Sequence, residues 1–389
     1  MTSRPWVIDD DRYERLRLIA WWDQERLARS KVLVVGAGAL GNEVLKNLAL
    51  IGIGRIYVID FDRIETSNLT RSVLFRQRDC GRSKAESAAA ALADMNPDWR
   101  VIAWDADVMC DVGLGLVRDM DVVIGCLDNR EARLWVNRMC WKAKVPWIDG
   151  GIQEINGVVK VFVPPDSACY ECAMTENDYR LINLRYSCPL LRQEDLLAGK
   201  VPTAPTIASF VGALQTQEAL KVIHGLPVQA GAALVFSGMT NQFYTTQLQR
   251  KEDCLSHDTY DEPIELPLTA AGNTAKDLFD AVRSATGATG TLTLALDRDL
   301  VVALAGVNGA GRKRVMRPLA LVSMKEAKIE ETGEVMRPEL VHEIREDSPL
   351  AGEKLSDLSI PAYDIVRVES EEGEYFCLLA GDRGLYDVV

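Results

Sequence analysis

No part of the sequence has the roughly 18 consecutive apolar residues that a membrane-spanning helix requires. The first twenty residues carry many charges, so we do not expect a secretory signal there. An excess of positive charge is also missing: the net charge is -13, which disfavours a nucleic-acid partner. These absences predict a soluble protein that interacts with neither membrane nor nucleic acid and that suits partners with basic surfaces.

A disulfide framework is not indicated either. The nine cysteines are scattered, and some of them, such as Cys126 and Cys140, lie inside apolar runs. This usage is typical of a reducing compartment, so we expect a cytoplasmic location. The sequence has no G-K-[ST] after a glycine-rich turn, which excludes a P-loop. It has no internal repeats, and its 389 residues suit two or three domains.

Apolar runs alternate with helical patterns over the first 150 residues. The runs predict strands at 31–35, 55–60, 99–104, 122–127 and 145–150. The helical patterns cover 42–51, 83–94 and 131–142, and an arginine- and tryptophan-rich helical lead-in is expected over 1–30. This alternation predicts an α/β fold with a doubly wound, Rossmann-like sheet. Strands at 157–163, 234–238 and 243–249, with a long helix over 206–224, complete a first domain at 1–258.

The remainder of the chain has its own pattern of secondary structure. Residues 259–267 are acidic and contain proline, so we expect a linker there. Residues 268–389 are long enough for a small C-terminal α/β domain. Strands are predicted in it at 291–297, 364–370 and 375–381, with a helix near 275–285.

The segment GAGALG at 36–41 fits the dinucleotide-binding pattern G-x-G-x-x-G. Gly36, Gly38 and Gly41 would permit a tight turn and a close approach of phosphates to a helix N-terminus. Asp60 closes the second predicted strand and suits a ribose hydroxyl. A nicotinamide dehydrogenase would carry the same glycines, and a glycine turn without a ligand remains an alternative.

The stretch D-F-D-R-I-E-T-S-N-L-T-R at 60–71, followed by Gly81 and Lys84, is more specific. It resembles the ubiquitin-activating (E1-like) superfamily, which includes the bacterial molybdopterin- and thiamine-pathway adenylases of the MoeB and ThiF type. The resemblance covers about 31–255. One departure is Ser72, where the family usually has glutamine.

The resemblance implies an ATP-dependent adenylation of the C-terminal carboxylate of a ubiquitin-like protein. It assigns the nucleotide to the motif that contains Asp60 and Asp62, and the phosphates to a set of polar and cationic residues. Asp128, in the segment C-L-D-N, matches the family's magnesium ligand, and a carboxylate suits that hard cation. The phosphate-binding residues implied are Asn68, Arg71 and Lys84.

The segment R-Y-E-R at 12–15 resembles a family motif in which the second arginine reaches across a dimer to the neighbour's ATP. Arg15 is the matching residue, so a homodimer is expected. The alternative is an arginine that lies on a helix surface without a role in the site.

Two cysteines in A-C-Y-E-C, Cys169 and Cys172, have the spacing of zinc ligands. Downstream, Cys254 and His257 form C-x-x-H where the family usually has C-x-x-C. We predict a structural zinc site that staples the crossover segment to the adenylation domain. The alternative is a pair of ordinary core thiols and a surface histidine.

Cys188 lies apart from these, inside a segment at about 173–204. By position it matches the catalytic cysteine of the eukaryotic activating enzyme for the ubiquitin-like protein NEDD8, so a thioester on Cys188 is implied. This chain lacks the large cysteine domain of that enzyme, and its compact form suggests a bacterial source. The tail at 268–389 weakly resembles the ubiquitin-fold domain that recruits an E2-like conjugating enzyme, although an oligomerisation module would have the same pattern.

Four functions remain open at this point. The first is an E1-like enzyme that uses ATP, Mg²⁺ and a structural Zn²⁺ and passes the carrier from Cys188 to an E2-like partner. The second is an adenylase for a sulfur-carrier protein, with an acyl-persulfide at the same cysteine. A dehydrogenase is disfavoured because hydride transfer needs no cations for phosphates. A scaffold subunit without activity is disfavoured by the complete set of charged residues.

Overall fold

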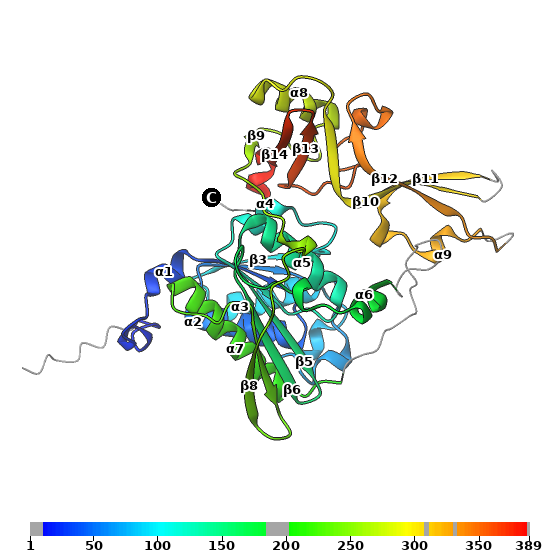
Figure 1. Cartoon of the computed structure of the whole chain (residues 1–389). Helices are drawn as coiled ribbons and strands as arrows, with labels where there is room; N and C mark the ends of the chain where they lie inside the picture. The colour runs from blue at the N-terminus through cyan, green and yellow to red at the C-terminus, as the bar shows by residue number, and fades with distance from the viewer. Residues whose placement is uncertain (1–10, 184–201, 307–310, 330–332, 387–389) are drawn as a thin grey trace, which may run out of the picture.

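The computed structural model describes residues 11–183, 202–306, 311–329 and 333–386 (Figure 1). Within these residues, the strands form an eight-stranded and a six-stranded sheet. The order of the first sheet is β3-β2-β1-β4-β5-β6-β7-β8. Its strands are β1 (Lys31–Val35), β2 (Arg55–Ile59), β3 (Arg100–Trp104), β4 (Val122–Gly125), β5 (Trp147–Gln153), β6 (Asn156–Phe162), β7 (Ala232–Ser237) and β8 (Gln242–Gln247).

The first five strands of this sheet pair in parallel and are covered on both faces. Leu33 and Val35 of β1 join one apolar core, whereas Val32 and Val34 join the core on the opposite face. Burial on both faces explains why the run KVLVV is apolar without alternation. The predicted doubly wound sheet is therefore present, and its strand order reverses between β1 and β4, where such sheets bind ligands.

The helices divide between the two faces of the sheet. Helices α2, α3 and α7 contribute to one core, and helices α4 and α5 contribute to the other. Among the described residues, no helix is both long and apolar enough to cross a bilayer. The bounds are α1 (Gln24–Arg29), α2 (Ala39–Ile51), α3 (Lys84–Met95), α4 (Leu114–Arg118), α5 (Arg130–Ala143), α6 (Glu176–Asn183) and α7 (Pro205–His224).

The expected helical lead-in is largely wrong over its described part. Residues 11–30 contain only a three-residue 3-10 helix, Leu16–Leu18, and the short helix α1. Ile19 has extended backbone dihedrals and ends the first piece, and the Asp23 side chain caps α1 by accepting from Arg26 N–H. An N-cap aspartate in the middle of the segment starts a new helix rather than continuing one.

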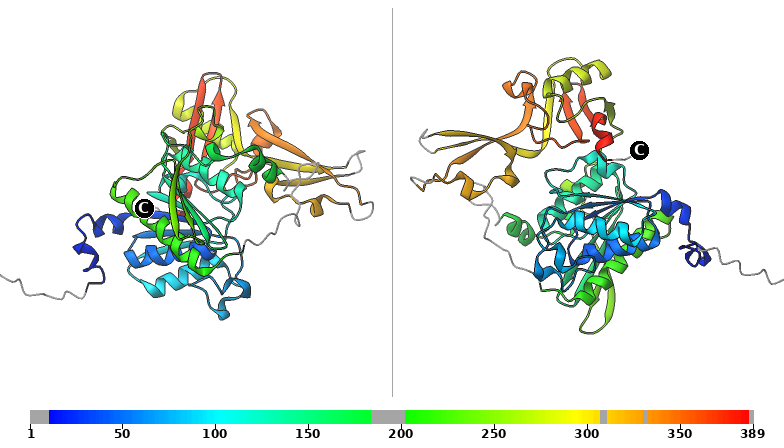
Figure 2. Two further views of the ribbon diagram at one scale, coloured as in Figure 1. Left: turned by 60° about the horizontal axis from the view of Figure 1, so that its bottom comes forward. Right: turned by 180° about the vertical axis from the view of Figure 1, so that it is seen from behind.

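Helix α7 covers one face of the antiparallel half, and the opposite face is covered near Trp147 and Phe162 but is partly open around Val158 and Val235, a part called the uncovered face below. Strands β5 to β8 pair antiparallel, and α7 packs on one side of them. The β7–β8 hairpin extends away from the rest of the molecule (Figures 1 and 2). All six residues of the edge strand β8 are exposed.

The second sheet has the order β11-β10-β13-β14-β9, with β12 also paired to β10. The helix and the three strands predicted from sequence are present, while β9, β11 and β12 were not anticipated. A ribbon of β10, β11 and β12 projects to one side (Figure 1). The elements are β9 (Ile264–Leu266), α8 (Ala275–Thr286), β10 (Thr293–Ala305), β11 (Arg312–Pro318), α9 (Met324–Ala327), β12 (Arg337–Arg345), β13 (Ile365–Ser370) and β14 (Gly373–Leu379).

The segment 259–267, expected to be a linker, contains ordered structure. Tyr260 is 5% exposed and stacks on Phe376 at 4.1 Å between ring centroids. Strand β9 within the segment pairs in parallel with β14, the last strand of the second sheet. Residues 264–266 therefore belong to the second sheet, where Leu266 is buried and Ile264 is partly buried against the core.

The two sheets are joined by a shared apolar core and by buried polar contacts. Tyr363, Leu378 and Tyr386 from the second unit belong to the same core as α4 and α5. Leu114 N–H donates to Asp364 Oδ1 at 2.6 Å. Arg298 donates to backbone carbonyls of the first unit and lies 4.5 Å from the Trp135 ring centroid. The C-terminal unit is thus packed against the first domain.

The topology of the C-terminal unit leaves its ubiquitin-like character a prediction. Its first and last strands, β9 and β14, are parallel neighbours, and α8 packs in the core of this sheet. The projecting ribbon has a second, smaller core centred on Val301, Leu304, Val322 and Ala327. The unit therefore has two lobes along β10.

Candidate functional site

The glycine-rich turn after β1 leads directly into α2. Gly36 has a φ of +97°, and its N–H donates to Ile59 O at 2.8 Å. A Cβ atom at Gly41 would lie 1.9 Å from Gly36 O, so this approach of helix and turn requires glycine. Gly38 is the N-cap of α2, and a Cβ there would meet no atom within 4 Å. The turn leaves open space beside a helix N-terminus, which favours an anion.

The carboxylate of Asp60 holds this turn to the next loop. Its Oδ2 accepts from Ala37 N–H at 2.7 Å and its Oδ1 accepts from Asp62 N–H at 2.8 Å. Burial raises the pKa of Asp60, although the nearby Lys84 ammonium opposes the rise. Lys84 Nζ in turn lies 2.7 Å from Asp62 Oδ2. A phosphate that binds Lys84 must therefore compete with the Asp62 carboxylate.

Asn68 and Arg71 lie on the irregular segment that connects β2 to α3. Both are partly exposed. Arg71 Nη1 donates to Ser67 O at 2.8 Å. The end of the segment is attached to α2, because Leu74 N–H donates to the buried Asn42 Oδ1 at 2.8 Å. This bond fixes the segment to the first turn of the helix whose N-terminus adjoins the glycine turn.

Asp128 follows β4 in the loop that lies against the glycine turn. Cys126 N–H donates to Val35 O at 2.8 Å, which aligns the ends of β4 and β1. The Asp128 carboxylate is exposed and accepts from Asn129 Nδ2 at 3.3 Å. Asn129 also caps α5 by accepting from Ala132 N–H at 2.8 Å. The carboxylate oxygens of Asp128 remain accessible to a cation.

The carboxyl ends of three neighbouring strands thus bring most of the predicted nucleotide residues to one edge of the sheet. This edge is the switch point of the strand order. The residues that it gathers are Gly36, Gly38, Gly41, Asp60, Asp62, Lys84 and Asp128, with Asn68 and Arg71 on the attached segment.

Two predicted residues are not part of this group. Tyr13 accepts from Asn96 Nδ2 at 2.7 Å and packs on Gly52, at the C-terminal end of α2. The exposed Arg15 follows it in the chain, so it lies near the end of α2 opposite the glycine turn. The 13 residues of α2 span about 20 Å. Cys188, the predicted nucleophile, lies outside the described residues.

Gln215 on α7 is a site residue that the sequence did not reveal. Its Nε2 donates to Gly125 O at 2.8 Å and to Ile148 O at 3.2 Å. These carbonyls belong to β4 and β5, whose ends lie beside the Asp128 loop. No sequence signal distinguishes Gln215, because α7 also contains other buried polar residues such as Thr216 and Glu218.

Arg133 on α5 is a second such residue. Its Nε donates to Asp149 Oδ1 at 2.9 Å, and its Nη2 donates to Gly150 O at 3.0 Å and to Leu127 O. The side chain therefore ties α5 to the end of β5 and to the loop that carries Asp128. The available sequence signal was its partner Asp149, a charged residue inside the strand run W-I-D-G.

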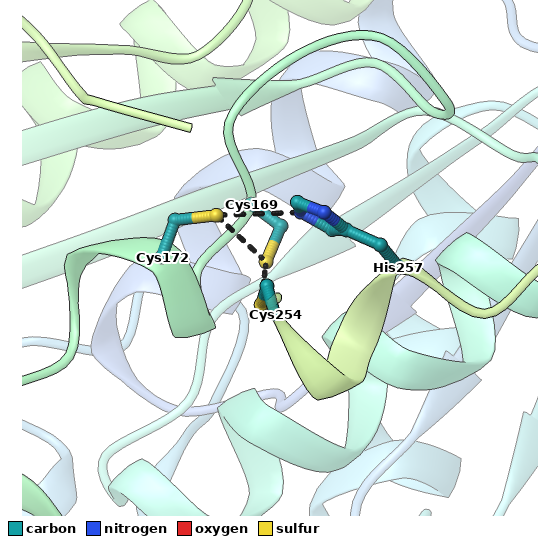
Figure 3. A group of neighbouring side chains, drawn as sticks. All are labelled: Cys169, Cys172, Cys254 and His257. Carbon is teal, nitrogen blue, oxygen red and sulfur yellow. Dashed lines mark hydrogen bonds between the residues drawn. The ribbon is translucent and has the colours of Figure 1, made fainter. Parts of the chain in front are cut away.

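The four predicted metal ligands meet in one cluster (Figure 3). Cys169 Sγ lies 3.7 Å from Cys172 Sγ and 3.5 Å from Cys254 Sγ. Cys172 Sγ lies 3.3 Å from His257 Nε2. All four ligand atoms lie within 4.8 Å of one another. Tetrahedral zinc with bonds of about 2.3 Å to sulfur would set the sulfur atoms about 3.8 Å apart.

The pKa values of two of the four ligands, His257 and Cys172, are shifted in the direction that favours metal binding, whereas burial raises the pKa of the Cys169 and Cys254 thiols. Burial and the neighbouring Arg250 charge lower the pKa of His257, which favours the neutral imidazole that ligates metals. Burial alone would raise the pKa of Cys172, but hydrogen bonds led by Lys251 N–H bring it below its ordinary value. Arg250 Nη1 lies 3.1 Å from His257 Nε2 and also donates to Ser167 O at 3.0 Å, a bond that it can keep when a metal takes the nitrogen.

Glu171 connects the segment that contains Cys169 and Cys172 to the segment that contains Cys254 and His257. It is 2% exposed and accepts from Tyr179 OH at 2.8 Å and from Arg138 Nη2 at 3.0 Å. It also accepts from the hydroxyl of Ser256, which lies between Cys254 and His257 in sequence. Glu171 thus links both cysteine segments to α5 and α6.

Comparison with known proteins places this geometry in context. Residues 11–256 match the ThiF family. The "Adenylyltransferase and sulfurtransferase MOCS3" of Drosophila yakuba is 32% identical over 229 residues, covering 59% of this chain and 48% of the relative. The protein of the same name from Mus musculus is 35% identical over 234 residues, covering 60% and 48%. The chain spans about half the length of these curated relatives.

A shorter relative is matched over almost its whole length. The "Molybdopterin-synthase adenylyltransferase" of Salmonella typhimurium is 32% identical over 252 residues, which are 62% of this chain and 94% of that protein. Among solved structures, E. coli MccB with ATP is similar with a TM-score of 0.53 and 26% identity. The match covers 65% of this chain and 75% of MccB.

Proposed function

The chain belongs to the ThiF family, and from this premise we propose that it adenylates the C-terminal carboxylate of a small sulfur-carrier protein. The observation that carries the proposal is the set of charged residues beside the glycine turn, with Lys84 and Asp128 at one edge of the sheet. A relative named for the adenylation of molybdopterin synthase is matched over 94% of its length, which favours a sulfur carrier over a ubiquitin-like modifier.

The proposed reaction uses the open space at the N-terminus of α2 for the phosphates of ATP. Lys84 would break its ion pair with Asp62 and bind the phosphate oxygens instead, together with Arg71. Asp128 would hold Mg²⁺, which neutralises charge on the phosphates when it is bound. A carboxylate oxygen of the carrier attacks the α-phosphorus, and the bond to the leaving pyrophosphate breaks. The product is an acyl-adenylate.

The uncovered face of the antiparallel half supplies a path for the carrier's C-terminal tail. Val158, Val235 and Tyr244 are in register across β6, β7 and β8 on the face opposite α7. Tyr244 is 56% exposed, and the two valines are partly exposed. Gly151 of β5 continues the row toward the end of β5, beside the loop that carries Asp128. A tail on this row would deliver its carboxylate to the nucleotide.

We further propose that the four-ligand cluster holds a structural zinc ion. Three thiolates and one imidazole are a sound tetrahedral ligand set for zinc. The two ligand pairs come from segments 169–172 and 254–257, which Glu171 already brings together. The ion would hold two parts of the chain in place: residues 169–172, after which the crossover segment (about 173–204) begins, and residues 254–257 at the end of the first domain.

The proposed homodimer depends on Arg15. Its position near the far end of α2 separates it from its own glycine turn, which suits a role in a neighbouring chain. Arg15→Ala and Asp128→Ala chains should each be inactive. Mixing them should restore activity to those mixed dimers in which one site draws both intact residues from different chains. Pyrophosphate exchange after subunit exchange measures the rescue, and homodimers of each variant are the controls.

The absence of rescue, with subunit exchange verified by differently tagged chains, would exclude action in trans. Full activity of Arg15→Ala alone would remove the residue from the site. Both outcomes leave the adenylation itself untouched, because the other charged residues belong to one chain.

A second candidate function is E1-like conjugation, with a thioester on Cys188 and transfer to an E2-like enzyme. The observation that favours it is the C-terminal unit, which follows residues 11–256, the part of the chain that matches the ThiF family. A unit packed this closely on the adenylation domain could present a partner beside the active site. Its ubiquitin-like fold, and the likeness to the NEDD8 activator, remain predictions.

The two functions differ in their products. With ATP, Mg²⁺ and a panel of sulfur-carrier and ubiquitin-like proteins, we expect carrier-dependent exchange of labelled pyrophosphate into ATP. A sulfide source should then yield a carrier thiocarboxylate, which mass spectrometry detects. An adduct on the enzyme that is lost on adding reductant, absent in Cys188→Ala and passed to an E2-like protein would favour conjugation instead. No exchange with any carrier would refute adenylation of such proteins.

A further inference from the structure

Lys160 lies where the uncovered face of the antiparallel half meets the nucleotide edge. It pairs with Asp149 of β5 and with Ala233 of β7 in the sheet register. Along β6 it follows Val158 by two residues, so both side chains point to the same face. Its side chain is 22% exposed. Lys160 therefore lies beside the row proposed for the carrier tail, one position along β6 on the same face.

The ammonium group of Lys160 is held loosely. Its Nζ lies 3.9 Å from Asp149 Oδ2, which is beyond hydrogen-bonding distance. It also lies 5.0 Å from the centroid of the Tyr170 ring. Burial lowers the pKa of Lys160, and the Asp149 charge only partly offsets this effect. Among the described residues, no acceptor lies within hydrogen-bond reach of this partly desolvated cation.

The other cations of this region are already engaged. Arg133 donates to Asp149 and to two backbone carbonyls, so turning it outward would break contacts that order the Asp128 loop. Arg130 Nε donates to Asp178 Oδ1 at 2.8 Å. Asp178 in turn accepts from Thr175 N–H at 2.9 Å, which fixes the start of α6. Lys160 is thus the cation on the carrier side that can turn to a new acceptor without breaking a hydrogen bond to a described residue.

We propose that Lys160 binds the terminal carboxylate of the carrier and guides it to the α-phosphate, an inference that rests on the proposed function. Adenylation brings a carboxylate against a triphosphate, and these anions repel each other in a site of low dielectric. A cation on the carrier side reduces the repulsion while the carboxylate approaches. A carboxylate also supplies the hydrogen-bond acceptor that the ammonium lacks.

The competing interpretation is that Lys160 only balances the buried charge of Asp149. In that case its removal would lower stability but leave the affinity for the carrier unchanged. Three variants separate the interpretations. Lys160→Gln removes the charge, and Lys160→Arg keeps it. Lys221→Gln is the matched control, because Lys221 lies on α7, against the opposite face of the sheet, pairs with Glu218 and is 28% exposed.

The first measurement is pyrophosphate exchange with the sulfur-carrier subunit of a bacterial molybdopterin synthase as probe. Lys160→Gln should raise KM for the carrier about tenfold and leave KM for ATP unchanged, because a charge-assisted hydrogen bond to the carrier is lost. Lys160→Arg should recover most of the affinity, and Lys221→Gln should behave as wild type. Thermal melting checks that each variant is folded.

The second measurement compares the carrier with a free C-terminal carboxylate and the same carrier with a C-terminal amide. Wild type should bind the amide about tenfold more weakly by calorimetry, whereas Lys160→Gln should bind both forms alike. Exchange with an unchanged carrier KM in Lys160→Gln, or equal discrimination by both enzymes, would overturn this role for Lys160 alone. No exchange by wild type with this probe or any other carrier would overturn the proposed function and this inference with it.

Discussion

Replacing Asp128 by alanine should abolish pyrophosphate exchange, with a loss of at least about a hundredfold in rate. The carboxylate is exposed at the end of β4 and accepts only a long hydrogen bond of 3.3 Å from Asn129 among the described residues. It is therefore free to bind a cation, and among the described residues its removal breaks only this long hydrogen bond. Loss of activity without loss of stability is the expected pattern.

The size of this effect follows from where charge develops. Pyrophosphate leaves with additional negative charge, and the site must offset that charge in a region of reduced dielectric. Lys84 and Arg71 would provide part of the compensation, but Lys84 is paired with Asp62 before ATP binds. A divalent ion held by Asp128 is the further compensation that the geometry allows.

Asp128→Asn is the sharper variant, because it keeps the shape of the side chain and removes the charge. It should lose nearly as much exchange activity as Asp128→Ala while its melting temperature stays that of wild type. Asp280→Ala, an exposed aspartate on α8 in the C-terminal unit, is the matched control and should retain full activity. Exchange at the wild-type rate in Asp128→Asn would remove the residue from the mechanism.

The parallel half of the first sheet was predictable because its strands are buried on both faces. Such strands need apolar residues at every position, and KVLVV at 31–35 satisfies this directly. The glycine turn was equally predictable from sequence, because the close contact of Gly41 with Gly36 O restricts position 41 to glycine. Local sequence is enough to predict an element when the residue types within one short segment determine its structure.

The C-terminal unit was harder to predict because its strands lie at edges and interfaces. Strand β11 has the sequence RKRVMRP, whose charges suggest a loop, yet charged side chains are how exposed edge strands avoid pairing with other chains. Strand β9 has three residues in an acidic segment, and its partner β14 lies more than a hundred residues later. Such pairings depend on the assembled core rather than on local pattern.

The same reasoning explains which site residues were missed. Glu171 was visible between the two cysteines of A-C-Y-E-C, but its partners Arg138 and Ser256 come from distant segments. Lys160 has no motif at all. Its relevance arises from its register with Asp149 and from the engagement of Arg133 elsewhere. A sequence gives residue types, whereas the long distance between the Lys160 ammonium and its partner Asp149 is a property of the folded protein.

Removing the metal from the four-ligand cluster should destabilise the protein strongly. Purified protein should contain about one zinc per chain, and Cys169→Ser should lose the metal and lower the melting temperature by about 10 °C. The ligands Cys169 and Cys172 belong to the core that also contains α5 and the end of the C-terminal unit. Loosening them affects both parts of the molecule.

The hydrogen bonds of Glu171 limit how much stability the protein loses when the metal is removed. Glu171 accepts hydrogen bonds from Ser256 and Arg138, so the two ligand segments keep one connection when the metal is gone. Glu171→Gln should therefore be tolerated in the zinc-bound protein but should add to the damage of Cys169→Ser by more than the sum of the single changes. Differential scanning calorimetry measures this non-additivity.

Two control variants test whether the metal itself is responsible. Cys80→Ser changes a partly exposed thiol outside the cluster and should leave zinc content and melting temperature unchanged. His257→Cys restores the four-cysteine set that is usual in the family and should keep the metal, because a thiolate can replace the imidazole as ligand. A wild-type protein without zinc, whose melting temperature a chelator does not change, would refute the metal. The short sulfur distances would then reflect three packed thiols and a histidine, and Glu171 would be the group that joins the two segments.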